Sequence, residues 1–137
     1  MYTASDYTTA FGEVFQSTRA ITLSAAKALA AWTPRRPLRL LDLTDTWSVR
    51  NGASGSLDSA PPSTCRAWAR EIRATWPDLD GLRSLSTVTK RPMVTLFAPA
   101  EDSFPDGPSL SRALVHRAVV PLAVQAADDL EWPIRRV

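Results

Sequence analysis

The residues that could do chemistry in this chain are few and scattered. There is one histidine, His116, and one cysteine, Cys65, so a Cys/His zinc site cannot be assembled, and no nucleophile stands beside a base in the sequence. The five glycines are dispersed and match neither the dinucleotide-binding spacing G-x-G-x-x-G nor the Walker phosphate loop. The remaining candidates are carboxylates, arginines and hydroxyls, whose chemistry depends on where the fold places them.

Glu13 has the most informative position among the carboxylates. An apolar stripe with helical spacing surrounds it in the sequence and consists of Tyr7, Ala10, Phe11, Val14 and Phe15. Ser5 or Asp6 is suited to cap this helix, which we expect to run to about Gln16. Glu13 flanks the stripe, so its carboxylate is expected at the edge of the core. Position alone is more typical of a solvated glutamate than of a catalytic one.

The other patterns predict a mixture of helices and strands. We expect helices at 24–32 and from Ser63 or Thr64 to about Trp76, the second with Trp68, Ile72 and Trp76 in the core. Strands are predicted at 38–43, 82–86, 93–97 and, as an edge strand, 131–137; loops are predicted at 51–62 and 98–108, while 109–124 is ambiguous and broken at Pro121. The fold class is therefore α+β, a compact mixed sheet with flanking helices.

Composition narrows the class of protein. A chain of 137 residues is expected to form a single domain, 1–137. The net charge is only +2 and the basic residues are scattered, so we do not expect nucleic-acid binding. One cysteine allows no disulfide within the chain, and neither a membrane-spanning run nor a signal peptide is seen. These features favour a cytoplasmic protein.

The scattered residues belong to a series of short motifs. In chain order they are Tyr2-Thr3-Ala4, Ala10-Phe11-Gly12-Glu13-Val14-Phe15, Leu40-Leu41-Asp42-Leu43, Ala67-Trp68-Ala69, Asp80-Gly81-Leu82-Arg83-Ser84-Leu85-Ser86 and Val94-Thr95-Leu96-Phe97. In this order and approximate spacing the series resembles the RES domain family, named for its Arg, Glu and Ser. The resemblance covers about residues 2–97.

The resemblance implies both a site and a reaction. Tyr2, Glu13 and Ser86 match the family's Tyr, Glu and Ser, which makes Glu13 and Ser86 the candidate catalytic residues and all three candidate contacts of the nucleotide. The family is similar to ADP-ribosyltransferase folds and consumes NAD as its substrate, by phosphorolysis or hydrolysis of the nicotinamide–ribose bond or by ADP-ribosyl transfer. No metal is expected. Many members are toxins held inactive by a protein antitoxin. A sheet edge left open by the absence of the family's first strands would favour a homo-oligomer.

One departure from the family pattern leaves alternatives open. The family's Arg precedes the Tyr-x-Ala motif, in a segment that this sequence lacks, and its possible substitutes are Arg19, Arg35, Arg83 and Arg91. The chain is therefore either an NAD-degrading enzyme or a truncated, inactive RES-like module that acts in protein–protein interaction of the antitoxin type. An unrelated α+β ligand-binding domain is a third reading, favoured if Tyr2, Glu13 and Ser86 do not meet in one cleft.

Overall fold

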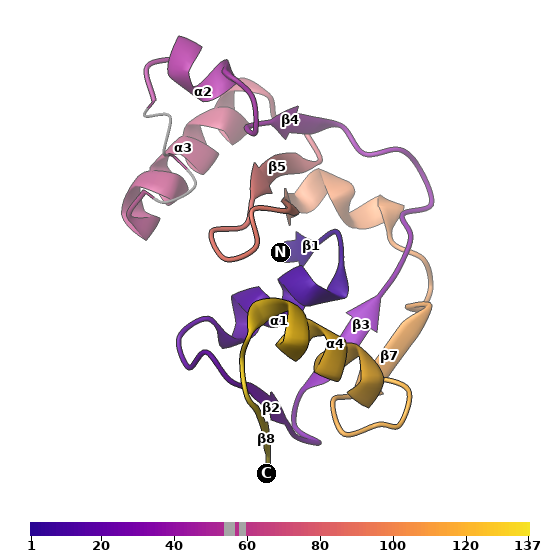
Figure 1. Cartoon of the computed structure of the whole chain (residues 1–137). Coiled ribbons are helices and arrows are strands. Elements are labelled where there is room, and N and C mark those ends of the chain that lie inside the picture. The colour runs from indigo at the N-terminus through magenta and orange to yellow at the C-terminus, as the bar shows by residue number, and fades with distance from the viewer. Residues whose placement is uncertain (54–56, 58–59) are drawn as a thin grey trace.

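A computed structural model describes residues 1–53, 57 and 60–137. The elements, in chain order, are β1 (Tyr2–Ala4), α1 (Tyr7–Phe15), β2 (Ile21–Leu23), β3 (Ala28–Ala31), β4 (Leu40–Asp42), α2 (Trp47–Arg50), α3 (Pro62–Thr75), β5 (Gly81–Leu85), β6 (Pro92–Leu96), the 3-10 helix η2 (Ala98–Ser103), β7 (Leu110–Ala113), α4 (Val120–Leu130) and β8 (Ile134–Arg136). The chain combines helices with a mixed four-stranded sheet and two separate strand pairs, which confirms the α+β class (Figure 1).

The largest sheet has the strand order β1-β6-β5-β4. Strand β6 pairs antiparallel with both β1 and β5, whereas β4 joins β5 in parallel. Gly81 begins β5 at a point of close approach, since a Cβ atom there would lie 2.2 Å from the backbone oxygen of Thr95. No other residue fits at that distance, so Gly81 sets how tightly β5 and β6 pair.

A second layer packs beside this sheet, where α1 and α4 lie side by side (Figure 1). Its core contains Phe11 and Phe15 from α1 and the small residues Ala123, Ala126 and Ala127 from α4. Alanines let the two helices approach closely, while each phenylalanine ring buries a large apolar surface. The parallel strands β2 and β8 close this layer at the end that carries the C-terminus.

The α2–α3 region is packed more loosely than the α1–α4 layer. It lies at the opposite end of the molecule from β2 and β8 (Figure 1). Helix α3 buries only Ile72 among its described side chains. Trp47 of α2 makes edge contacts with Trp68 and Trp76, at centroid separations of 6.3 and 6.2 Å. Trp76 is nevertheless 42% exposed, so its prediction as a core residue was wrong.

The predicted helix at 24–32 was wrong, because part of this segment is strand β3. Ala28–Ala31 pairs antiparallel with Leu110–Ala113 of β7. Alanine favours a helix locally, but the preference is a fraction of a kcal/mol per residue and the ladder of backbone hydrogen bonds outweighs it. The same pairing resolves the ambiguous segment 109–124, which begins as β7.

Proline positions explain two further differences. Pro121 was read as a break, yet it lies in the first turn of α4, where its missing N–H costs nothing. Pro61 occupies the N-cap of α3, and neither Ser63 nor Thr64 caps that helix as predicted. The predicted loop 98–108 begins with the 3-10 helix η2. In the predicted loop 51–62, residues 54–56 and 58–59 lie outside the described residues, and Leu57 is buried.

Candidate active site

Glu13 and Ser86 come together although 73 positions separate them in the chain. The Ser86 hydroxyl donates a hydrogen bond to Oε1 of Glu13 at 2.6 Å. Glu13 lies in the last turn and a half of α1, half-buried at the edge of the apolar stripe as the spacing predicts, and Ser86 directly follows β5. The short distance indicates a charge-assisted bond, in which the carboxylate is the acceptor.

The turn after β5 holds the Ser86 hydroxyl in one orientation. Its oxygen accepts hydrogen bonds from the backbone N–H groups of Val88, at 3.1 Å, and Thr89, at 3.0 Å. With its proton on Glu13 and both lone pairs occupied, the hydroxyl has no capacity left. Ser86 is only 1% exposed. It is therefore built to orient Glu13 and is poorly placed to attack a substrate itself.

Contacts near the start of α1 hold the helix against this turn. Asp6 caps α1 by accepting a hydrogen bond from the Thr9 backbone at 2.9 Å, and it forms an ion pair with Arg91 at 3.2 Å. Burial opposes the charge of Asp6, but the hydrogen bonds from Thr9 and Arg91 prevail and lower its pKa. The hydroxyls of Thr9 and Thr89 lie 2.8 Å apart. These bonds fix the turn that carries Ser86 onto the helix that carries Glu13.

Close packing completes the alignment of the helix and the turn. Gly12 precedes Glu13, and a Cβ atom there would lie 3.2 Å from Cγ1 of Val88. A side chain at position 12 would therefore press against the turn. Glycine allows the approach that brings Ser86 within reach of Glu13.

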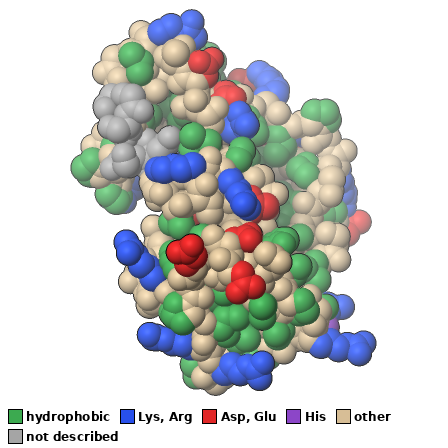
Figure 2. Space-filling model, in the orientation of Figure 1, with side chains coloured by type: hydrophobic (Ala, Val, Ile, Leu, Met, Phe, Trp, Pro, Cys, Tyr) green, Lys and Arg blue, Asp and Glu red, His purple; other side chains and the backbone are tan. Residues whose placement is uncertain are grey.

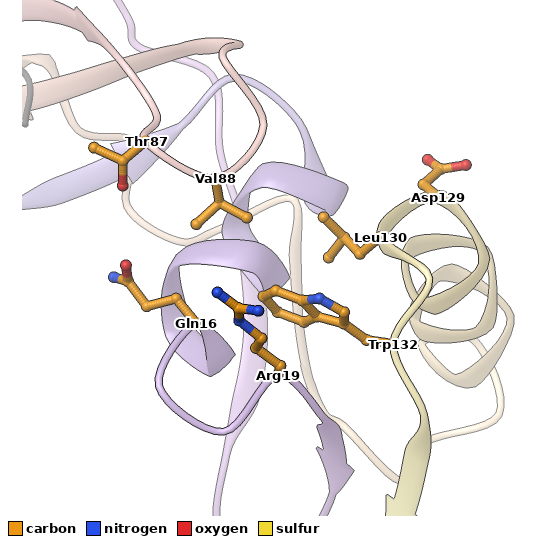
Figure 3. A pocket seen from close by; sticks show the side chains of 7 residues that line it. All are labelled: Gln16, Arg19, Thr87, Val88, Asp129, Leu130 and Trp132. Carbon is orange, nitrogen blue, oxygen red and sulfur yellow. The ribbon is translucent and has the colours of Figure 1, made fainter.

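A cavity of about 500 Å³ lies next to the turn that carries Ser86, and Figure 3 shows its lining, which includes neither Glu13 nor Ser86. It is lined by Gln16, Arg19, Thr87, Val88, Asp129, Leu130 and Trp132. Thr87 and Val88 directly follow Ser86, and the Gln16 amide contacts Oε2 of Glu13 at 3.4 Å. The volume is within the usual range for small-molecule sites.

Tyr2 is the candidate that the structure does not bring to the pair. It lies on β1 opposite Thr95, and its side chain is 76% exposed. Among the described hydrogen bonds, none joins Tyr2 to Glu13 or Ser86. Two of the three residues that the resemblance selects therefore meet, and the third lies on the edge strand β1, which β6 separates from β5.

The four candidate arginines differ in their partners. Arg35 pairs with Asp106, Arg83 with Asp42 at 2.7 Å, and Arg91 with Asp6. Arg19 lines the cavity and, within the described part of the chain, makes no ion pair. Trp132 and Asp129 of the cavity were not predicted, because they reach it only through the packing of α4 on α1 and the pairing of β8 with β2.

Asp80 shows the opposite surroundings, those of a structural carboxylate. Its oxygens accept two hydrogen bonds from the Arg36 guanidinium, each 2.8 Å long, and a third comes from the Arg39 backbone at 2.7 Å. The Arg36 guanidinium is the main cause that lowers the pKa of Asp80 to about 2. Asp80 is 1% exposed, and its carboxylate links the segment before β4, which carries Arg36 and Arg39, to the start of β5.

Two general findings concern what else the described residues can hold. Across residues 1–53, 57 and 60–137, no three His, Cys, Asp or Glu side chains gather in the manner of a metal site. Among the helices that the structure describes, none combines the length and hydropathy that a membrane-spanning segment requires.

The fold and the site define an α+β domain in which a helix carboxylate is oriented by a strand-end serine beside a cavity. The family model described as RES domain matches residues 1–115, and the chain belongs to this family. The match continues beyond the last recognised motif, at Phe97, through β7. Comparison with curated proteins and with solved structures gives no match.

Proposed function

We propose that this RES domain breaks the nicotinamide–ribose bond of NAD, with Glu13 as the catalytic carboxylate. The observation that carries the proposal is the 2.6 Å hydrogen bond by which Ser86 orients Glu13, whose other oxygen contacts Gln16 in the lining of a cavity of about 500 Å³. Within the described residues, no Lys or Arg forms an ion pair with Glu13. Its negative charge is therefore available to a reacting group.

This charge suits the bond that would break. The electron pair of the C1′–N bond leaves with nicotinamide, whose ring becomes neutral, and positive charge develops on C1′ and the ribose ring oxygen. A carboxylate held near that ribose stabilises the transition state more than the ground state. An oxygen of phosphate or water then bonds to C1′, and water gives up a proton in doing so. ADP-ribosyl transfer would differ only in that a protein side chain supplies this attacking atom.

Ser86 and Tyr2 take different parts in this proposal. Ser86 is a positioning residue, because its hydroxyl is already committed to Glu13 and to two backbone donors. Oε1 of Glu13 accepts from Ser86, whereas Oε2, which the Gln16 amide contacts at 3.4 Å, is the oxygen that would face the ribose. A contact between Tyr2 and the nucleotide stays a prediction from the family resemblance.

The experiment that tests this function measures nicotinamide release from NAD, with and without phosphate. Glu13→Gln keeps the acceptor for Ser86 but removes the charge, so we expect release to fall about 100-fold or more. Identification of the product as ADP-ribose or ADP-ribose 1″-phosphate distinguishes water from phosphate as acceptor. An unchanged rate in Glu13→Gln, or no release by the wild-type chain, would contradict the proposal.

Ser86→Ala tests the positioning role separately. It leaves the carboxylate charged but frees its orientation, so we expect release to fall about tenfold. It also leaves the Val88 and Thr89 N–H groups without their acceptor, which should cost about 1–2 kcal/mol of unfolding free energy. Ser86→Thr, which keeps a hydroxyl, should restore most of the rate. If Ser86→Ala keeps the full rate, the hydroxyl does not position Glu13 for catalysis.

A non-catalytic module that binds a protein partner, such as an antitoxin, is the second candidate. The observation in its favour is the exposed surface around α2 and α3, where Val49 is 56% and Trp76 42% exposed. Large apolar side chains on a surface are typical of protein-binding sites when they cluster. The nicotinamide assay decides between the two, since this candidate requires that wild-type chain and Glu13→Gln are equally inactive.

A further inference from the structure

We infer that Arg19 and Trp132 form a nucleotide-binding subsite, in which Arg19 holds the phosphates and Trp132 stacks on the adenine ring. This inference rests on the proposed function for the identity of the nucleotide. It includes Trp132, which lies outside the family match, since the match ends at residue 115. The candidate ligand is the ADP-ribose portion of NAD.

The pairing of β2 with β8 places both residues at the same level of the fold. Ile21 lies opposite Ile134 in the parallel ladder, and the Ile21 N–H donates to the Pro133 carbonyl at 2.9 Å. Arg19 and Trp132 each precede this pair by two residues, so both leave the ladder at its N-terminal end. Their side chains point into the cavity from two different loops (Figure 3).

Both loops are fixed by their own backbone bonds. The Arg19 N–H donates to the Phe15 carbonyl at 2.8 Å, with Arg19 in the left-handed region at φ 45°. The Trp132 N–H donates to the Ala127 carbonyl at 2.9 Å, after Glu131 at φ 56°. Each loop therefore closes one helix and aims one side chain. Such preorganisation lowers the entropic cost of binding a ligand.

The lining of the cavity includes one cation, Arg19, and one anion, Asp129. Arg19 is a cation whose described surroundings include no carboxylate at ion-pair distance, so its guanidinium can bind an anion. Asp129 lines the same cavity, and hydrogen bonds from Gln125 and Thr8 lower its pKa, which keeps it anionic. The Asp129 carboxylate points away from Arg19 and Trp132 in Figure 3 and accepts from Thr8 and Gln125, so it does not neutralise Arg19, and the phosphates are attracted to Arg19.

Acidic groups also surround this part of the surface. Figure 2 shows acidic side chains gathered over α1 and α4, with basic side chains mostly at the outline of the same face. A dianionic ligand entering here needs a cation, and Arg19 is the cation that the cavity supplies. Trp132 is half-buried against the α1–α4 core, so it can offer a fixed aromatic surface to a base.

Binding of ADP-ribose tests this inference without any turnover, because ADP-ribose lacks the bond to nicotinamide. Titration calorimetry of Arg19→Asn should show a Kd raised about 10- to 100-fold, the usual effect of losing a charged hydrogen bond. Asparagine tolerates the left-handed backbone, so this variant should fold. Arg19→Lys keeps the charge and should lose less. The matched control is Arg117→Asn, an exposed arginine outside the cavity, which should bind as wild type.

Adenosine separates the two halves of the subsite. Its Kd should change less than about twofold in Arg19→Asn, because it has no phosphate. Trp132→Leu should weaken both adenosine and ADP-ribose about 5- to 100-fold, whereas Trp132→Phe keeps a stacking ring and should stay within a few-fold of wild type. Circular dichroism of each variant shows that it is folded.

The outcomes distinguish this inference from the proposed function. If ADP-ribose binds through Arg19 but no nicotinamide is released from NAD, the subsite stands and the catalytic proposal fails. If nicotinamide is released while Arg19→Asn keeps the wild-type Kd for ADP-ribose and the wild-type KM for NAD, the subsite is overturned alone. Absence of ADP-ribose binding by the wild-type chain also overturns it.

Discussion

Glu13 and Asp80 are two carboxylates of one motif series, and their surroundings are opposite. Asp80 is almost completely buried, with both oxygens held by Arg36 and a further bond from the Arg39 backbone. Glu13 is half-buried beside a cavity, and its shortest described contact is the neutral hydroxyl of Ser86. The charge of Asp80 is paired with a cation, whereas the charge of Glu13 is only held in one orientation.

This difference separates the structural role of Asp80 from the catalytic role that we propose for Glu13. A guanidinium that holds Asp80 stabilises its negative charge in the folded state and leaves none for a ligand. A hydroxyl donor fixes the direction of the Glu13 carboxylate but does not neutralise it. Two carboxylates of equal charge can thus be distinguished by their hydrogen-bond partners. Replacing each by its amide should therefore change the stability of the protein by different amounts.

Asp80→Asn should give the largest loss of stability. Removing the charge leaves Arg36 with an amide that offers a donor where it needs an acceptor, which should cost about 2–3 kcal/mol of unfolding free energy. For a chain of this size the melting temperature should fall by about 10 °C. Thermal unfolding followed by circular dichroism measures it. Glu13→Gln is the matched comparison and should stay within about 0.5 kcal/mol. Equal losses in the two variants would show that both carboxylates are structural.

Low pH should remove the contribution of the Asp80 carboxylate to the free energy of unfolding. Folding lowers the pKa of Asp80 from 3.8 to about 2, so its stabilisation is complete above the unfolded value and is lost as the pH falls from about 5 to below 2. The shift corresponds to about 2 kcal/mol. Melting temperatures at several pH values should therefore fall more steeply for wild type than for Asp80→Asn. Parallel curves would mean that other carboxylates, such as Asp6 and Asp42, carry the acid sensitivity.

Gly12→Ala should have the smallest effect on stability and a visible effect on the site. Alanine gains about 0.5–1 kcal/mol in a helix interior, but its Cβ atom would lie 3.2 Å from Val88 and displace the turn that carries Ser86. We expect near cancellation in the unfolding free energy and a several-fold loss of nicotinamide release. Adding Val88→Ala gives the turn room and should restore the rate. A stabilised Gly12→Ala with full activity would show that the contact does not align the pair.

Local patterns predicted the parts of the fold that depend on neighbouring residues. The Asp6 cap and the apolar stripe predicted α1, and the two apolar runs around the turn at 86–91 predicted β5 and β6 to within one residue. The run 38–43 contains β4, an edge strand whose Leu40 and Leu41 are half-buried and whose Asp42 is exposed. Strand β2 was not predicted, because its three residues carry no motif and its partner β8 lies at the far end of the chain.

The sequence by itself determined the family, the α+β class and the choice of Glu13 and Ser86, because motif order and residue spacing are local properties of the chain. Only the tertiary structure decided that Ala28–Ala31 is a strand, that Glu13 and Ser86 share a hydrogen bond, and that Arg19 and Trp132 line one cavity. Each of these depends on contacts between distant segments, whose combined free energy exceeds the weak local preferences that a sequence displays.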